Sequence, residues 1–425
     1  MIILILAAVV IAGVVALFIF GTQKSGTQLS GNLSFWGVFD DSATMQPLID
    51  SYKALHPKAK IEITYTEVDS DTYEQKLVDS LAGTNPPDMF MFHNTWLPKH
   101  VNKIFPISAD AMSLASFKNL FPTVAQQDFA PDNAVYALPL YIDTLAMFYN
   151  QDIFDNKGIA LPPKTWEEFA KIVPKIREVD KFGRITKAAA ALGGSNKSIN
   201  RATDILNLLM LQSGTEMVAS DFSAATFDSS QGERALNFYT SFANSRDPLY
   251  TWNESLPYSL DSFAAGETAI MFNYSHQIGF LKEKSPFLKF RVAPMLQPES
   301  RQQDVNFANY WGLAVSNKTQ NQALAQDFIL YMTTNADASK KYLELSGRPP
   351  ALRSLISQYA ATQPDLGIFA NQALTARSWP EVDNAAVDSI FSGMIANVIA
   401  NRLPANRALS EAASKVTDLM QRRAR

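Results

Sequence analysis

Hydrophobic positions after residue 32 alternate between a period of two and a period of 3.6, which predicts strands and helices in turn. Strands are expected at residues 33–39, 61–65 and 89–92, and amphipathic helices at residues 45–55 and 71–81. Asp71 and Glu74 are interpreted as a cap pair at the start of the second helix. Strand–helix–strand–helix–strand at this spacing predicts a parallel sheet with helices on its faces.

The alternation resumes in the middle of the chain. Further strands are expected at residues 145–149, 269–272 and 311–315. One helix is expected to begin at a capping box at residues 165–168, and another at a cap formed by Ser230 and Glu233. Helices are also expected at residues 200–213 and over most of 385–425. Pro174 should kink the helix that begins at the capping box. The pattern predicts two α/β lobes, with ligand bound in a cleft between them at the carboxyl ends of strands.

The N-terminal segment is different from the rest of the chain. Residues 2–20 contain no charge and no strong polar group, and at 1.5 Å per residue they span about 28 Å, close to the hydrocarbon thickness of a bilayer. They predict an uncleaved transmembrane anchor, and a cleaved secretory signal is the alternative. Residues 21–31 are rich in Gly, Ser and Thr and predict a flexible linker to a body at residues 32–425.

The composition of the 425-residue chain argues against several kinds of binding site and catalytic site. The net charge is −4, so no basic excess favours nucleic-acid binding. The absence of Cys excludes disulfides, thiolate metal sites and Cys nucleophiles, and the four His residues lack the spacing of a catalytic zinc site. Residues 193–198 only partly match a phosphate-binding loop. We therefore expect no nucleotide, no metal and no cofactor.

Aromatic residues stand beside amides and carboxylates at several predicted strand ends. These clusters lie at residues 36–41, 93–96, 141–143, 252–253, 273–276 and 309–311. Sugars pack their C–H faces on aromatic rings, and their hydroxyls bond carboxylates and amides, so the clusters suit a carbohydrate site. A single Trp or Tyr is more often part of a core, and Asp40 or Asp41 also suits a helix cap. These residues alone leave a two-lobed binder and a carbohydrate enzyme both open.

Six segments carry a family resemblance. They are residues 33–40 (LSFWGVFD), 81–88 (LAGTNPPD), 136–143 (YALPLYID), 163–169 (PKTWEEF), 263–271 (FAAGETAIM) and 310–316 (YWGLAVS). Together and in this order, they resemble the family 1 extracellular solute-binding proteins of ABC transporters, the sugar-type group that includes maltose-binding proteins. The resemblance implies two hinged α/β lobes that close on ligand. It places about 33–140 and 304–346 in lobe 1, and about 144–303 and 347–425 in lobe 2.

The resemblance and the aromatic clusters together predict which residues contact ligand. They are Phe39, Asp40, Asp41, Asn94, Trp96, Tyr141, Asp143, Trp252, Tyr274, His276, Asn309 and Trp311. Asp143 matches a carboxylate near the hinge that binds sugar hydroxyls in maltose-type members. His276 stands where those members carry a stacking Trp. Either Tyr274 and Trp252 supply the aromatic platform here, or the ligand differs from maltodextrin.

The resemblance implies a function outside the cytoplasm. The chain would be the monomeric substrate-binding component of an ABC importer, capturing a mono- or oligosaccharide and delivering it to the permease subunits. Its soluble body would lie on the extracytoplasmic face of the cell membrane, with residues 2–20 replacing the usual lipoprotein Cys as anchor. Two alternatives remain. Paired Asp residues with aromatic platforms also suit a membrane-tethered glycosidase, and the same body would suit a ligand-sensing subunit of a signalling system.

Overall fold

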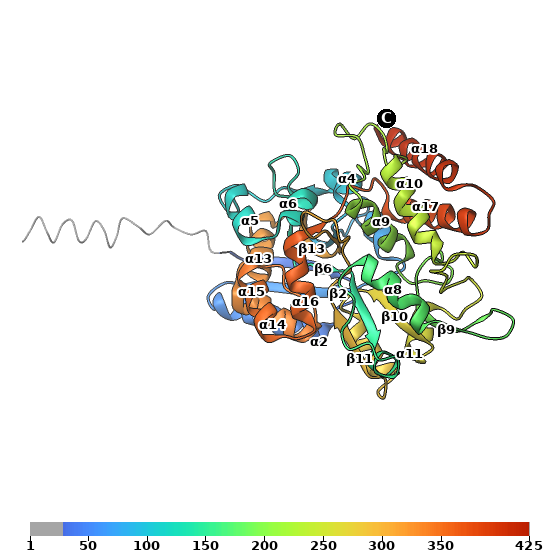
Figure 1. Cartoon of the computed structure of the whole chain (residues 1–425). Helices are drawn as coiled ribbons and strands as arrows, with labels where there is room; N and C mark the ends of the chain where they lie inside the picture. The colour runs from blue at the N-terminus through green and yellow to red at the C-terminus, as the bar shows by residue number, and fades with distance from the viewer. Residues whose placement is uncertain (1–28, 425) are drawn as a thin grey trace, which may run out of the picture.

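The computed structural model describes residues 29–424, which form two α/β lobes, each with its own sheet and hydrophobic core (Figure 1). This confirms the fold class predicted from the alternation of strand and helix patterns. The predicted anchor at residues 2–20 and most of the predicted linker lie outside the described residues. Within residues 29–424, no helix combines the length and the apolar character needed to cross a membrane.

The first lobe is built on a six-stranded sheet with strand order β2-β1-β3-β13-β4, and β5 also pairs with β13. Its strands are β1 (Gly31–Gly37), β2 (Ile61–Glu67), β3 (Met89–His93), β4 (Ile104–Phe105), β5 (Ala137–Pro139) and β13 (Trp311–Ser316). β1 is parallel to β2 and β3, whereas β13 runs antiparallel to β3 and pairs Trp311 with His93. The carboxyl ends of β1 and β3 therefore meet the amino end of β13 at one edge of the sheet.

The helices of the first lobe contribute to a core centred on this sheet, in which Phe35, Phe92 and Phe328 are fully buried. They are α2 (Ser42–Leu55), α3 (Tyr73–Ala82), α4 (Leu97–His100), α5 (Leu114–Leu120), α6 (Thr123–Phe129), α13 (Gln322–Thr334), α14 (Ala336–Ser346) and α15 (Arg353–Thr362). Leu355 and Ile356 of α15 belong to this core. The predicted lobe 1 ends at about residue 346. The structure extends that lobe through α15, because the hydrophobic face of α15 packs on the first core.

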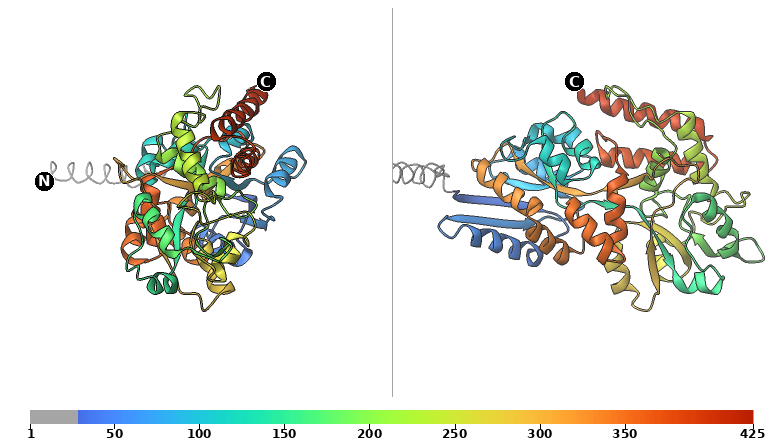
Figure 2. Two further views of the ribbon diagram at one scale, coloured as in Figure 1. Left: turned by 45° about the vertical axis from the view of Figure 1, so that its right-hand side comes forward. Right: turned by 60° about the vertical axis from the view of Figure 1, so that its left-hand side comes forward.

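The second lobe has a five-stranded sheet with strand order β11-β7-β10-β9-β8. Its strands are β7 (Ala146–Asn150), β8 (Glu178–Val179), β9 (Ile185–Ala190), β10 (Thr268–Asn273) and β11 (Phe290–Ala293). Its helices are α7 (Gln151–Asn156), α8 (Trp166–Ile176), α9 (Ala202–Gln212), α10 (Ser230–Ser241), α11 (Ser259–Ala264), α12 (Gln277–Lys284), α17 (Asn384–Ile399) and α18 (Ala405–Ala424). The last two pack on each other and on α10, at one end of the molecule (Figure 2).

Three crossing segments connect the lobes in a small third sheet with strand order β14-β12-β6. They contain β6 (Asp143–Thr144), β12 (Asn306–Asn309) and β14 (Ala376–Arg377). Before β14, the short helix α16 (Leu366–Gln372) contributes Phe369 to the second core and Ala370 to the first. The lobes are therefore joined by three strands that bond to one another, which favours hinge motion over independent movement of the lobes.

The predicted helix starts agree only in part with the structure. Thr165 caps α8 by accepting a hydrogen bond from the Glu168 backbone N–H, and Pro174 lies inside the helix near its end. The cap pair predicted for α3 is wrong, because Thr72 precedes the helix without a side-chain cap and Glu74 instead bonds His100. α10 is capped by Ser229, one residue before the predicted Ser230.

Candidate ligand-binding cleft

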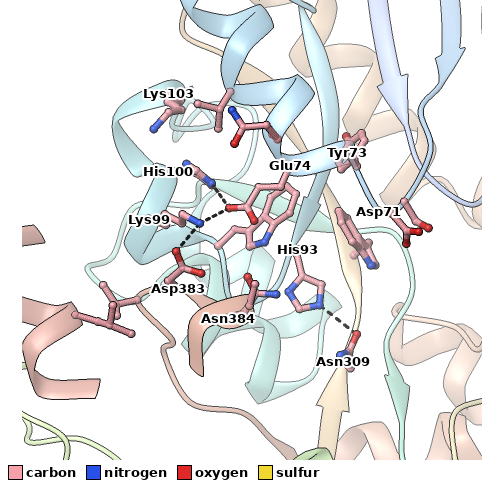
Figure 3. A pocket seen from close by; sticks show the side chains of 18 of the residues that line it. Asp71, Tyr73, Glu74, His93, Lys99, His100, Lys103, Asn309, Asp383 and Asn384 are labelled. Atoms are coloured by element: carbon pink, nitrogen blue, oxygen red, sulfur yellow. Dashed lines mark hydrogen bonds and ion pairs between the residues drawn. The ribbon is translucent and has the colours of Figure 1, made fainter. Parts of the chain in front are cut away.

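The cleft between the lobes contains three cavities of about 840, 200 and 80 Å³. All three are lined by Arg201 of the second lobe and by Asn309 at the end of crossing strand β12. The largest lies between the edge of the first sheet and helices α17 and α18 (Figure 3). These shared residues make the cavities parts of one interlobe site.

An aromatic wall lines the first-lobe side of the large cavity. Trp311 begins β13, and its ring centroid lies 5.1 Å from Trp96 and 5.6 Å from Tyr73, edge to face in both pairs. Tyr73 in turn stacks on Trp96 at 5.9 Å. Such a cluster fixes each ring through its neighbours. Trp311 is only partly buried, so part of its surface is available to a ligand.

Phe39 adds a ring that is held in an unusual backbone conformation. Its φ is +70°, in the left-handed region that residues other than Gly, Asn and Asp seldom adopt. Its side chain is 52% exposed, lines the large and the smallest cavities, and meets Trp311 edge to face at 5.9 Å. Non-glycine residues in this region cluster at functional sites, because such strain persists only where the surrounding structure imposes it.

A buried carboxylate joins a crossing strand to the second lobe. Asp143 of β6 accepts hydrogen bonds from the Ser275 hydroxyl at 2.7 Å, from the Ser275 backbone N–H at 3.0 Å, and from the Thr144 backbone N–H at 2.9 Å. Burial raises the pKa of Asp143 to about 6, although the Ser275 hydrogen bond and Arg348 lower it. Asp143 lines the smallest cavity, but protein donors already occupy most of its lone pairs.

Two arginines, which the sequence analysis did not identify, enter the same cavity from opposite lobes. Arg201 precedes α9 with a φ of +68°, and its guanidinium lies 5.2 Å from the Tyr274 ring centroid. Arg348 follows α14 and lies 5.0 Å from the Tyr141 ring centroid and 5.8 Å from that of Phe39. Both residues line the 80 Å³ cavity. Each cation is thus positioned by an aromatic face.

Two histidines of the cleft are held neutral. Burial lowers the pKa of His93 to about 4, and its Nε2 lies 3.1 Å from Asn309 Oδ1 (Figure 3). Burial lowers the pKa of His276 to about 3, and Arg201 and Arg348 lower it further. His93 has both ring nitrogens bonded within the protein, since its Nδ1 also bonds Thr95 at 2.9 Å, and His276 Nε2 lies 3.0 Å from Gln277 Nε2. These neutral imidazoles therefore hold neighbouring side chains of the cleft in place.

A charged cluster lines the large cavity and connects the two lobes. Lys99 Nζ lies 2.8 Å from Glu74 Oε1 and 2.8 Å from Asp383 Oδ2, and Glu74 also bonds His100 Nε2 at 2.8 Å (Figure 3). These hydrogen bonds and cations hold the pKa of Glu74 at about 2 despite burial, which alone would raise it. Because Asp383 caps α17 in the second lobe, the cluster bonds the lobes together at the cavity wall.

The sequence profile of the bacterial extracellular solute-binding proteins matches residues 48–365, which is most of the chain. The chain belongs to this family. This solute-binding protein is 27% identical over 244 residues to a putative binding protein of Brucella abortus, and the match covers 55% of each chain. It therefore spans about half the length of that relative. Identity to the maltotriose-binding protein of Pyrococcus abyssi is 22% over 345 residues, covering 77% of this chain and 68% of the relative.

A solved structure with the same architecture is that of the cyclic alpha-maltosyl-1,6-maltose binding protein of Arthrobacter globiformis. The two superpose with a TM-score of 0.77 at 18% identity, over 92% of this solute-binding protein and 100% of the other chain. At this identity, the likeness shows the fold alone. The family resemblance seen in the six sequence segments is confirmed by these comparisons.

The cavities bring together nine of the twelve side chains predicted to contact ligand. They are Phe39, Asn94, Trp96, Tyr141, Asp143, Tyr274, His276, Asn309 and Trp311. Their exposure to a ligand differs, because Asn94 is buried and bonds Asp128 and Tyr310, while Trp96 is mostly covered by its neighbours.

The other three predicted residues have structural roles in this solute-binding protein. Trp252 is 0% exposed in the core of the second lobe and donates from Nε1 to Ser198 Oγ at 3.0 Å, so its predicted place in the cleft is wrong. Asp40 is buried and accepts from the Tyr342 hydroxyl at 2.9 Å. Asp41 is exposed and caps α2 by accepting from the Thr44 backbone N–H at 2.8 Å.

Sequence reasoning missed the charged residues of the cleft. No sequence motif predicts a ligand-binding role for Arg201, Arg348, Lys99 or Asp383, although Arg201 lies in the helix predicted at residues 200–213. One local signal was present at Arg348, since the glycine before it and the two prolines after it mark a helix end followed by a rigid loop. Such loops often carry binding residues.

Proposed function

We propose that the chain captures a carbohydrate between its two lobes and delivers it to the permease of an ABC importer. The observation that carries the proposal is an interlobe cleft in which an aromatic wall faces polar side chains from both lobes. Aromatic faces and hydrogen-bonding groups on opposite sides are what a sugar ring requires. The names of the relatives, which include a multiple sugar-binding protein and a maltotriose-binding protein, support this class of ligand.

The mechanism would be closure of the lobes about the three crossing strands. A ligand that contacts both lobes stabilises the closed form by its difference in affinity for the two forms. The cleft residues come from both lobes, with Trp311 and Phe39 on one side and Arg201 and Tyr274 on the other. Closure would also enclose the ligand until a permease opens the lobes.

Calorimetry against a library of neutral, acidic and phosphorylated sugars tests capture directly. Small-angle scattering of the same samples should give a smaller radius of gyration with a bound sugar than without it. Binding without compaction would contradict closure. Chemical analysis of the ligand after incubation separates a binder, which returns the sugar intact, from the glycosidase alternative, which returns shorter products.

We further propose that residues 2–20 anchor the protein in the membrane, so that the body stays near the permease on the extracytoplasmic face. Support comes from nineteen consecutive uncharged residues, which are long enough to span a bilayer. The protein should fractionate with membranes and resist extraction by high salt. Finding the native protein free in the medium would contradict the anchor, although not the capture of sugar.

A further inference from the structure

Arg201 and Arg348 form a pair of cations for which the protein supplies few hydrogen-bond acceptors. Among the described residues, no acceptor forms a hydrogen bond with either guanidinium, and Arg348 has no carboxylate within 4 Å. Arg201 Nε is buried without a partner, and its nearest ion pair, to Asp204, is long at 3.9 Å. The Arg201 side chain is 36% exposed and Arg348 is partly buried, but a buried N–H without an acceptor, such as Arg201 Nε, is costly, so a ligand that supplies acceptors would be favoured here.

The nearby carboxylates do not fill this role. Asp143 bonds Ser275 and Thr144, and Asp204 accepts from the Tyr274 hydroxyl at 2.8 Å. Asp40 bonds Tyr342 and does not line the cavity. These groups offset part of the arginine charge at a distance, but their lone pairs point at other donors. In the part of the chain that the structure describes, the guanidinium N–H groups of these two cavity-lining arginines therefore have no hydrogen-bond acceptor.

The 80 Å³ cavity is the smallest of the three and is about a tenth of the size of the 840 Å³ cavity. It has room for an oxyanion group between the two arginines. It shares Phe39, Arg201, Asn309 and Trp311 with the 840 Å³ cavity, which can hold the remaining part of a larger ligand. The positive field is felt by His276 at the same cavity, since both arginines disfavour its protonation.

We infer that the ligand is an acidic carbohydrate whose carboxylate or phosphate is bound between Arg201 and Arg348, while its sugar part lies against the aromatic wall. Arginine binds both oxyanions through two parallel N–H donors directed at two oxygens, whereas a neutral hydroxyl offers a single oxygen and does not match that two-oxygen geometry. Because the arginines belong to opposite lobes, an oxyanion between them would also draw the lobes together. This inference rests on the proposed capture of a carbohydrate, and it adds that the carbohydrate is negatively charged.

Matched sugars test the charge of the ligand. The full chain in detergent is titrated calorimetrically with glucose, glucuronate and glucose 6-phosphate, with the corresponding galactose set, and with maltotriose beside trigalacturonate. At least one acidic sugar should bind tenfold or more tightly than its neutral partner, and its affinity should fall as salt rises. Preference for uronate or for phosphate then identifies the oxyanion.

The possible failures can be told apart. If a neutral sugar binds as tightly as its acidic partners, the acidic ligand is excluded while carbohydrate capture stands. If none of these sugars binds, both the acidic ligand and the proposed function fail. If acidic ligands without a sugar, such as phosphate or acetate, bind as tightly as the acidic sugars, the cavity binds the anion but the carbohydrate assignment fails.

Variants test whether these two arginines are responsible. Arg201→Gln and Arg348→Gln should each reduce the acidic-to-neutral affinity ratio at least tenfold, with neutral-sugar affinity changed less than threefold. Arg348→Lys, which keeps the charge but loses the bidentate geometry, should retain part of the preference. Arg291→Gln is the control, because Arg291 is exposed on β11 outside the cleft cavities. Retention of the full ratio in both glutamine variants would overturn the inference, and circular dichroism establishes that each variant is folded.

Discussion

The ammonium of Lys99, in the first lobe, lies 2.8 Å from a carboxylate oxygen of Asp383, in the second lobe. The same ammonium bonds Glu74 of its own lobe at 2.8 Å. Because the Lys99 side chain is partly shielded from water, this ion pair should contribute more than a fully exposed one. It acts only while the lobes are together, so it stabilises the closed form relative to an open one.

Replacing Lys99 with Met should therefore open the ligand-free protein. Loss of the interlobe ion pair should cost about 1 kcal/mol of closed-state stability, or about a fivefold change in the closed-to-open ratio. Small-angle scattering should show a larger radius of gyration than for the wild type. Lys53→Met is the matched control, because Lys53 pairs with Glu62 at 3.0 Å within the first lobe. Equal radii for the two variants would show that the Lys99 ion pair does not favour closure.

Substitutions of two tryptophans should affect different properties, one the affinity for sugar and the other the stability of the fold. Trp311→Ala removes a partly exposed ring of the aromatic wall and should weaken sugar binding about tenfold, with little loss of stability. Trp252→Ala empties a site in the second core and should lower the free energy of unfolding by about 3–5 kcal/mol. Denaturant unfolding and calorimetry on the folded fraction measure both effects. Unchanged affinity in Trp311→Ala would remove that ring from the site.

Asp143 and Asp41 provide a comparison between two carboxylates with different roles. Asp143→Ala leaves the Ser275 N–H and hydroxyl without their acceptor at the cleft, so sugar affinity should fall at least tenfold. Asp41→Ala removes the cap of α2, so stability should fall while affinity stays within twofold. Calorimetry with a sugar that binds the wild type decides the matter. If the folded fraction of Asp143→Ala binds normally, Asp143 is purely structural.

Acid should destabilise the wild type more than it destabilises His276→Gln. In the folded protein the pKa of His276 is lowered to about 3, while the unfolded chain binds a proton near the ordinary value of 6.5. The stability contributed by neutral His276 is therefore present above pH 6.5 and is lost as the pH falls toward 3. By pH 4, the wild type should lose about 3 kcal/mol relative to the variant.

Urea unfolding at pH 7.5, 5.5 and 4 checks this difference. Other groups with shifted pKa values, such as Asp143, are present in both proteins, so their effect on the difference should be small. Parallel pH curves for the wild type and His276→Gln would mean that His276 is protonated as easily in the folded protein as in the unfolded chain.

Much of the fold could be predicted because its signals are local. The hydrophobic spacing of Met45, Leu48, Ile49 and Tyr52 gives the buried face of α2 directly. The cap of α3 was not predictable in the same way, since an acidic residue in the first turn of a helix can bond other partners, as Glu74 does when it pairs with Lys99. Helix propensity does not predict which hydrogen-bond or ion-pair partner the tertiary fold provides for such a side chain.

The site was harder to predict, because it depends on which segments meet. Trp311 and Trp252 look alike in sequence, each within two residues of an Asn, yet one lines the cleft and the other fills a core. Arg201 and Arg348 are far apart in the chain, and only the crossing of the chain between lobes brings both to one cavity. Such convergence has no signature in the sequence around either residue.

The order in which the chain supplies its two cores has a consequence for synthesis. Strand β13, which joins β3 to β4 and β5 in the first sheet, follows the whole of the second sheet in sequence. The core of the second lobe likewise waits for α17 and α18 at the end of the chain. A nascent chain emerging from the ribosome therefore cannot complete the first lobe and then the second. The first core becomes complete only after α15 has been synthesised and the second only after α18, and until then unpaired strand edges are exposed to wrong pairing.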